Sequence, residues 1–168
     1  MADNVLRRSP KELAAHVVKL AYQRRVTLAT VESCTAGCLR TCLPKRRVPA
    51  RCCTAGLSSA PKKTAVGVSE KLLSVHTAVS AEVAQAMAEG GLARCPAGLV
   101  AAITGVAGPA PDENGNPVGL VYVAAAALDG RRRVVRHDFG QLPQDEICGA
   151  AMVAALKLLE ELLTAQVP

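Results

Sequence analysis

The sequence predicts an α/β fold, a single layered domain with a mixed sheet, from its composition and from the order of its elements. Hydrophobic residues make up 50% of the 168 residues, yet the chain has two tyrosines, one phenylalanine and no tryptophan. A core of Ala, Val, Leu and Ile suits helices that cover a sheet. Segments typical of strands alternate with segments typical of helices, as in layered α/β domains. We expect residues 1–168 to form one domain, with residues 1–9 flexible.

The first predicted element is a helix at residues 10–25, and a strand at residues 26–31 follows it. Ser9 is a typical N-cap, Pro10 suits the first turn, and apolar residues then recur at helical spacing. The next run is short and rich in β-branched residues, which favours a strand.

The rest of the chain predicts two more helices, a loop, a hairpin and a closing helix. Asp129-Gly130 is typical of a hairpin turn, so the strands on either side of it are expected to be antiparallel. The elements in chain order are a short capped helix at 68–73, a helix at 80–94, a buried strand at 99–104, a loop at 105–118, strands at 119–128 and 134–139, and a helix at 144–163.

The positive charge of the chain is concentrated in one segment. The formal net charge is +6, whereas residues 40–63 alone contribute +7, and no acidic residue lies between Glu32 and Glu70. That segment has no aromatic side chain to stack on bases, so we do not expect a nucleic-acid partner. No apolar run reaches about 18 residues, and no apolar segment follows the N-terminus as in a signal peptide. We therefore expect a cytoplasmic protein without a membrane segment.

The seven cysteines are an odd count for a disulfide framework, and we read them as thiols. Cys34, Cys38 and Cys42 are spaced so that their sulfurs share one helix face, and the adjacent pair at 52–53 offers two further ligands. This spacing matches no standard zinc pattern, so we expect no metal. The two remaining cysteines are expected to be packed thiols: Cys95 and Cys148.

Three segments carry small, polar or glycine residues where strands begin or end: residues 32–37, 103–109 and 116–119. The first two leave the carboxyl ends of predicted apolar strands, which is the edge where ligands bind in open α/β sheets. Hydroxyls, glycines and exposed N–H groups there suit a phosphate or a nucleotide. A plain connection is the alternative that spacing alone leaves open. The polar tip at 112–114 is either a solvated turn or a lid over a ligand.

Together with three further motifs, these segments closely resemble the CinA C-terminal-domain family, which includes nicotinamide-mononucleotide (NMN) deamidases. The resemblance covers about residues 10–163. It implies a three-layer α/β/α fold, a homo-oligomer and a serine amidohydrolase that uses Ser, Tyr and Lys with no metal or other cofactor. The implied reaction hydrolyses the amide of NMN to give nicotinic acid mononucleotide and ammonia. The motifs are ESCTAG at 32–37, GVSEKLL at 67–73, HTAVS at 76–80, AMAEG at 86–90, ITGVAGP at 103–109 and NPVG at 116–119.

Matched position by position, the resemblance implies Lys62 and Thr104 as catalytic residues, and Lys63 is a close rival of Lys62 for the position of the family's lysine. The family's tyrosine falls at Leu57, and the turn that carries its serine falls at residues 48–52, which contain no serine. Cys52 is the alternative nucleophile in that turn, because a thiolate is a competent nucleophile.

The resemblance also implies that two loops bind the substrate, a small NMN-like nucleotide. The family's late Gly-Asp-Arg motif falls at residues 140–144 and lacks its arginine. Because the serine, the tyrosine and this arginine are missing, a catalytically inactive nucleotide-binding relative is the alternative function. The implied substrate-binding residues are Glu32, Ser33, Cys34, Thr35, Gly37, Gly105, Ala107, Gly108 and Pro109.

Residues 38–62 are atypical of the rest of the chain, and we hypothesise that they are read in a shifted frame. One choice of codons for residues 44–58, read from the third base, gives EAPGAGEVLHGGLV, which resembles the family's turn and strand at this place. A shifted frame explains together why the segment is rich in Cys, Arg and Pro and why it lacks acids. The coding DNA tests this hypothesis.

Overall fold

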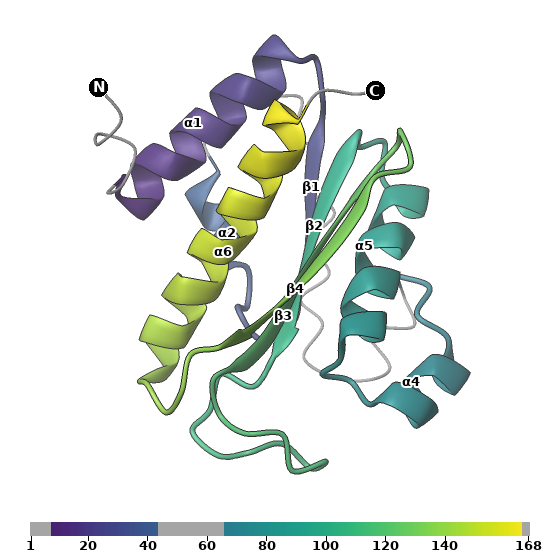
Figure 1. Ribbon diagram of the computed structural model, residues 1–168, viewed down its shortest axis with the longest axis vertical. Helices are drawn as coiled ribbons and strands as arrows, with labels where there is room; N and C mark the ends of the chain where they lie inside the picture. The colour runs from purple at the N-terminus through teal and green to yellow at the C-terminus, as the bar shows by residue number, and fades with distance from the viewer. Residues whose placement is uncertain (1–7, 44–65, 166–168) are drawn as a thin grey trace.

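The protein forms three layers, with a sheet between two layers of helices (Figure 1). The computed structural model describes residues 8–43 and 66–165. The described sheet has four strands in the order β1-β2-β3-β4. Its elements are α1 (Pro10–Gln23), β1 (Leu28–Glu32), α2 (Cys38–Cys42), α4 (Glu70–His76), α5 (Ala81–Arg94), β2 (Leu99–Gly105), β3 (Leu120–Ala127), β4 (Arg132–Asp138) and α6 (Gln144–Thr164).

The sheet is mixed, as the sequence predicts. β1 pairs with β2 in parallel, whereas β2 with β3 and β3 with β4 are antiparallel. Helices α1 and α6 cover one face, and α5 covers the other (Figure 1). The prediction of an α/β domain with a mixed sheet is therefore confirmed.

Each face of the sheet has its own hydrophobic core, because successive strand residues point to opposite faces. In β2, Leu99, Ala101 and Ile103 belong to the core under α1 and α6, while Val100 and Ala102 belong to the core under α5. A Cβ added at Gly91 of α5 would lie 2.7 Å from Val31 Cγ2 and 3.0 Å from Val100 Cγ1. The glycine thus lets α5 lie close against the sheet.

Side-chain caps fix the starts of α1 and α5 at the residues that the sequence indicates. Ser9 and Glu12 form a capping box, in which the Ser9 N–H donates to Glu12 Oε2 at 2.8 Å and the Glu12 N–H donates to Ser9 Oγ at 3.3 Å. At α5, Ser80 Oγ accepts from the Val83 N–H at 3.3 Å. Arg8 donates to Glu160 Oε1 of α6 at 2.9 Å, so residues 8 and 9 are held against the fold, whereas residues 1–7 lie outside the described part.

The starts of two strands differ from the predictions because the hydrogen bonds of neighbouring segments decide where each strand begins. The first strand begins at Leu28 instead of residue 26, since the Val26 N–H donates to the Ala21 carbonyl and completes the turn after α1. The last strand begins at Arg132 instead of residue 134, because Arg132 pairs with Ala126 of β3.

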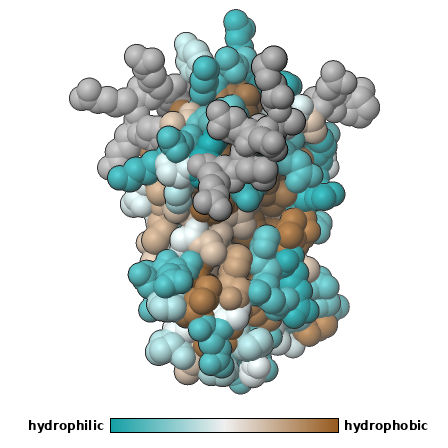
Figure 2. Space-filling view, turned by 60° about the vertical axis from the view of Figure 1, so that its left-hand side comes forward, coloured by the Kyte–Doolittle hydropathy of each residue, from teal (hydrophilic) through white to brown (hydrophobic). Residues whose placement is uncertain are grey.

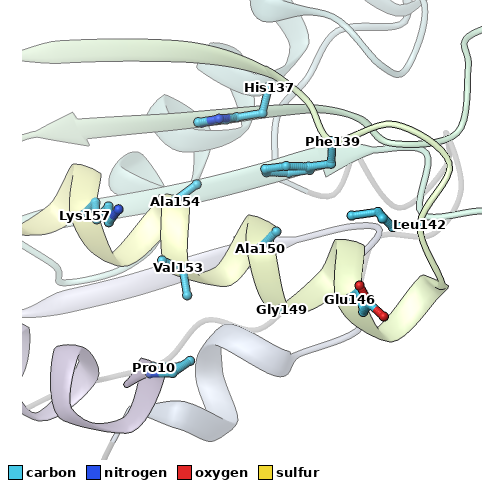
Figure 3. A pocket seen from close by; sticks show the side chains of 10 residues that line it. All are labelled: Pro10, His137, Phe139, Leu142, Glu146, Gly149, Ala150, Val153, Ala154 and Lys157. Carbon is cyan, nitrogen blue, oxygen red and sulfur yellow. The ribbon is translucent and has the colours of Figure 1, made fainter. Parts of the chain in front are cut away.

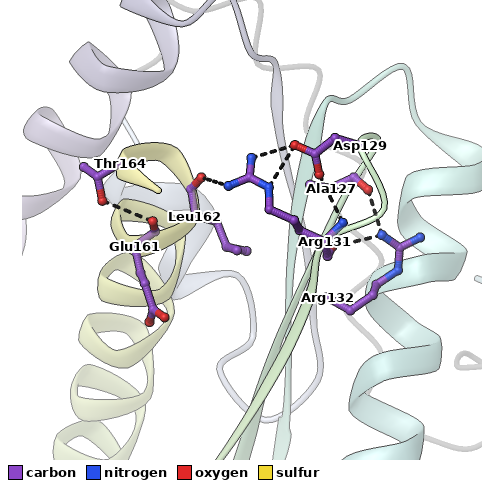
Figure 4. Close-up of polar contacts among 7 residues, drawn as sticks. All are labelled: Ala127, Asp129, Arg131, Arg132, Glu161, Leu162 and Thr164. Atoms are coloured by element: carbon purple, nitrogen blue, oxygen red, sulfur yellow. Dashed lines mark hydrogen bonds and ion pairs between the residues drawn. The ribbon is translucent and has the colours of Figure 1, made fainter. Parts of the chain in front are cut away.

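Arg131, in the turn of the β3–β4 hairpin, bonds to the end of α6 (Figure 4). Arg131 Nη1 donates to the Leu162 carbonyl at 2.6 Å, while its Nε and Nη2 donate to Asp129 Oδ2 at 2.9 and 2.6 Å. A cation at this place satisfies a carbonyl of the last helical turn and suits the negative end of the helix dipole. The three arginines of β4 itself also lie in ion pairs: Arg132 with Glu89, Arg133 with Glu161 and Arg136 with Asp138.

The cysteines differ in part from the prediction that all are thiols. Cys95, which follows α5 and is 6% exposed, is disulfide-bonded, so the prediction of a packed thiol is wrong there. Cys148 is a buried thiol, as predicted, and donates to the Cys34 carbonyl at 3.5 Å. Among residues 8–43 and 66–165, no helix is both long and apolar enough to cross a membrane.

Candidate functional site

The three segments singled out in the sequence meet at one edge of the sheet. β1 and β2 run in parallel with Glu32 beside Ile103, so the loops that follow them leave the same edge. β3 is antiparallel to β2, with Gly105 beside Val121, so the segment before β3 reaches that edge as well. The topology therefore brings together residues that lie far apart in the sequence.

Glu32 is a fully buried carboxylate with four hydrogen-bond donors around it. Its Oε1 accepts from Thr30 Oγ1 at 3.2 Å and from the Arg40 N–H at 2.9 Å. Its Oε2 accepts from Thr35 Oγ1 at 2.7 Å and from the Leu39 N–H at 3.1 Å. The Glu32 side chain is 0% exposed, and burying its charge would be costly without these four hydrogen bonds.

The Glu32 carboxylate acts as the N-terminal cap of α2. The N-cap position is Gly37, which has a φ of 93° and no side chain to offer. Glu32 instead accepts from the backbone N–H groups of Leu39 and Arg40, the second and third residues of the helix. The sequence predicts that the N–H groups at the start of this helix bind a ligand anion, whereas in the structure those of Leu39 and Arg40 bind the carboxylate of Glu32. Glu32 is therefore a residue that positions the loop.

Thr104 lies on the opposite face of the sheet from Glu32. Glu32 follows Leu28 and Thr30 on the face covered by α1 and α6, whereas Thr104 follows Val100 and Ala102 on the face covered by α5. Thr104 is fully buried, and its Oγ1 donates to the Ala78 carbonyl at 2.8 Å, in the segment before α5. The two residues therefore share an edge of the sheet without sharing a surface.

The remaining predicted residues of the first loop are held by backbone and side-chain contacts. The Ser33 N–H donates to the Ile103 carbonyl at 3.0 Å, which ties the first loop to the end of β2. The Cys34 carbonyl accepts from Cys148 of α6, and Thr35 is fully buried beside Glu32. The first loop is therefore bonded both to β2 and to α6.

The second loop is held chiefly by main-chain hydrogen bonds. The Val106 N–H donates to the Leu120 carbonyl at 2.9 Å, and the Gly119 N–H donates to the Val106 carbonyl at 2.8 Å. Gly108 has a φ of 93°, and the Gly108–Pro109 peptide bond is cis. The two backbone bonds of Val106 hold Gly105 and Ala107, and the Gly108–Pro109 segment that follows them, near the sheet edge.

Ala107 and Pro109 line a hollow of about 360 Å³ beside the second loop. A volume of this size lies at the lower end of the range for small-molecule sites. The hollow extends to residues 141–144, where the resemblance places the late motif of the family. The sequence did not predict Gln141 and Gln144 as site residues. Both lie where the family has its Gly-Asp-Arg motif, but this chain lacks the arginine, so nothing marked them. The full lining is Ala107, Pro109, Pro111, Val118, Gln141, Leu142, Pro143 and Gln144.

The polar tip of the second loop is a turn that closes on itself. Asp112 Oδ1 accepts from the N–H groups of Asn114 and Asn116 at 3.0 and 2.8 Å. Asp112 Oδ2 accepts from Asn116 Nδ2 at 2.8 Å. Of the two interpretations of this tip, these bonds favour the solvated turn.

Two thiols near Glu32, those of Cys38 and Cys148, have raised pKa values and stay protonated to higher pH than an ordinary thiol. The pKa of Cys38 is raised by partial burial and then by the charges of Glu32 and Cys42. The pKa of Cys148 is raised by burial and by the charges of Cys38, Asp145 and Glu32. No group of three or more metal-ligating side chains occurs in the described ranges 8–43 and 66–165.

Two of the three predicted catalytic residues cannot be placed. Lys62 and Cys52 lie outside the described residues, as does Leu57. Thr104 is the one of the three that lies in the described part, and the catalytic roles of all three residues stay predictions.

A family model for the CinA C-terminal domain matches residues 10–163. The chain belongs to this family. A CinA-like protein of Mycolicibacterium gilvum (strain PYR-GCK) is 42% identical over 107 residues, which are 62% of this chain and 25% of that protein. A CinA-like protein of Synechococcus sp. (strain RCC307) is 36% identical over 150 residues, 88% of this chain and 36% of that protein. The chain thus spans about a quarter to a third of the length of these curated relatives.

Solved structures of the CinA family show the same fold. The competence/damage inducible protein CihA from Agrobacterium tumefaciens has a TM-score of 0.85 and 30% identity, over 91% of this chain and 94% of that chain. The competence damage-inducible protein A from Klebsiella pneumoniae has a TM-score of 0.84 and 32% identity, over 95% of this chain and 100% of that chain. The three-layer arrangement is therefore that of the family.

Proposed function

We propose that this CinA-family protein is a nicotinamide-nucleotide amidohydrolase that acts on NMN in the cytoplasm. One observation carries the proposal: three of the segments that bear the family motifs, 32–37, 103–109 and 116–119, converge at one sheet edge, beside a hollow lined by Ala107 and Pro109. In the reaction, the amide C–N bond breaks, the oxygen of water ends in the new carboxylate, and ammonia takes up a proton. No metal or other cofactor is part of the proposal.

Some residues of this edge would hold the loops in shape, and others would take part in the reaction. Glu32 holds the first loop in shape through its four hydrogen bonds, and Ser33 to Gly37 then lie against the nucleotide. Thr104 is fully buried, and its hydroxyl, which donates to the Ala78 carbonyl, would hold the end of β2 in place. Lys62 would lie near the amide and move the proton, as the base that such a reaction requires.

A second candidate is a nucleotide-binding relative that does not turn its ligand over. The sequence favours it at specific positions: Leu57 stands where the family has tyrosine, and residues 48–52 contain no serine. The first loop and the hollow would serve binding in either case.

The test measures ammonia release from NMN and, in parallel, NMN binding by calorimetry. We expect turnover that Lys62→Ala abolishes and Lys63→Ala retains; the opposite result would assign the family's lysine to Lys63. Saturable binding without ammonia release in the wild type would refute the amidohydrolase and support the inactive binder. Absence of both binding and turnover would refute both functions.

A further inference from the structure

The polar tip of the second loop contains an asparagine that is followed by a glycine, Asn114-Gly115. Both residues are exposed, and a Cβ added at Gly115 would meet no atom within 4 Å. Among residues 8–43 and 66–165, the Asn114 side-chain amide has no hydrogen-bond partner. The backbone nitrogen of a following residue can attack an asparagine amide, and glycine, which has no Cβ, obstructs that attack least. The tip therefore holds both groups of a self-modification reaction in an open position.

We propose that Asn114 is a site of spontaneous deamidation, in which water is the co-substrate. The Gly115 nitrogen loses its proton and attacks Cγ of Asn114, the bond from Cγ to the amide nitrogen breaks, and ammonia leaves with a proton. This forms a succinimide ring, which water then opens at one of its two carbonyls. The product is aspartate or isoaspartate, so the steps together consume one water and release one ammonia per chain.

Asp112 controls how often the reaction can begin. The Gly115 N–H donates to the Asp112 carbonyl at 3.0 Å, so the attacking nitrogen is engaged while the turn is closed. Asp112 Oδ1 also accepts from the N–H groups of Asn114 and Asn116, which stabilises the closed turn. Deamidation therefore proceeds through local opening of the turn, and its rate follows the fraction of time that the turn is open.

Asn116, two residues later, has the same side chain in surroundings that prevent the reaction. Its Nδ2 donates to Asp112 Oδ2 at 2.8 Å, which holds the amide in place. The next residue is Pro117, whose ring nitrogen carries no proton to lose and cannot form the succinimide. The loop thus contains a natural control for Asn114.

The groove between β4 and α6 offers no comparable chemistry. It has a volume of about 590 Å³, and His137 and Phe139 line one side of it with ring centroids 5.3 Å apart, opposite Ala150 and Ala154 of α6 (Figure 3). In Figure 2, apolar residues gather on the lower half of the molecule, on the side where α1 and α6 lie. None of the side chains that line this groove reacts with water under mild conditions, in contrast to the amide of Asn114.

Deamidation would change the turn that it passes through. The product adds a negative charge to a tip that already contains Asp112 and Glu113. Isoaspartate also lengthens the backbone by a methylene group, which displaces the N–H groups that Asp112 Oδ1 accepts. Pro111, next to Asp112, lines the hollow beside the second loop, so the modification alters a segment that borders this hollow.

Incubation of the protein at pH 8 for several days, followed by peptide mass spectrometry, tests the proposal. We expect Asn114 to convert to aspartate and isoaspartate, more slowly at pH 6 because Gly115 must lose a proton, while Asn116 in the same peptide stays intact. An isoaspartyl methyltransferase labels the isoaspartate. The reaction needs no NMN, so its outcome does not depend on the proposed amidohydrolase. An intact Asn114, or equal conversion of both asparagines, would overturn the proposal.

Two variants of the tip test the role of the closed turn. Asp112→Ala removes the carboxylate that accepts from the turn, and we expect deamidation of Asn114 to become about tenfold faster. Glu113→Ala, the matched control, removes a neighbouring carboxylate that forms none of these bonds and should leave the rate almost unchanged. Circular dichroism checks that both variants keep the fold. Equal rates in the two variants would overturn the control of the reaction by Asp112.

Discussion

The two loops that leave the same sheet edge are held by different physical means. The loop after β1 is organised by the buried charge of Glu32, which accepts four hydrogen bonds. The loop after β2 is organised by backbone bonds, by glycines in left-handed conformations and by the Thr104 hydroxyl. The first loop thus concentrates four of its hydrogen bonds on one buried side chain, whereas the second is held by several separate backbone bonds.

The largest effect should come from Glu32→Gln. The amide keeps the shape but loses the charge, and its NH₂ group faces backbone donors that need an acceptor. We expect the free energy of unfolding to fall by about 3 kcal/mol, measured by urea denaturation. Glu12→Gln, the same change at an exposed carboxylate that also caps a helix, should cost much less. Equal losses would show that burial of Glu32 does not matter.

A smaller effect is expected for Gly119→Ala in the second loop. Gly119 has a φ of 90°, and a Cβ there would collide with the Gly140 carbonyl. The strained backbone and the collision together should cost about 2 kcal/mol in thermal unfolding. Gly115→Ala is the matched control, because Gly115 has a φ of 79° but no atom within 4 Å of the added Cβ. If the control costs as much, the close approach to Gly140 contributes nothing.

Thr104→Val removes one hydrogen bond of the second loop while keeping the size of the side chain. Because the hydroxyl donates to the Ala78 carbonyl at a fully buried position, we expect a loss of about 1.5 kcal/mol in urea denaturation. Thr104→Ser retains the donor and should lose less. A Val variant as stable as the wild type would show that this bond does not stabilise the fold.

The smallest effect concerns the thiols beside the first loop. Burial and the Glu32 charge raise the pKa values of Cys38 and Cys148, so both stay protonated to higher pH than an ordinary thiol. Their stabilising contribution is complete below the unfolded-state thiol pKa and is lost as pH rises through the raised value. We expect alkylation at pH 8 to be slow and to become faster in Glu32→Gln.

Thr104→Val controls for local opening in the alkylation experiment, since it weakens the fold without changing a charge near the thiols. Mass spectrometry after timed iodoacetamide treatment assigns the reaction to each cysteine. If Thr104→Val accelerates the reaction as much as Glu32→Gln does, the charge of Glu32 has no part in it.

The sequence by itself determined the layers, the mixed sheet and most helix starts. Ser9 and Ser80 were recognisable as caps because a side-chain oxygen meets its backbone donor within three residues, which is local chemistry. The strand starts at Leu28 and Arg132 were missed because they depend on hydrogen bonds with neighbouring segments, α1 for the first and β3 for the second.

Only the tertiary structure decided what the motif residues do. Glu32 and Thr104 both stand at the ends of apolar strands, yet alternation along two paired strands places them on opposite faces of the sheet. The role of Glu32 as a cap of α2, and the hollow between Ala107 and the segment at 141–144, join residues that are distant in sequence. Sequence patterns indicate which residues can form hydrogen bonds and which can be buried. The pairing of strands that are distant in sequence decides which of these residues come into contact.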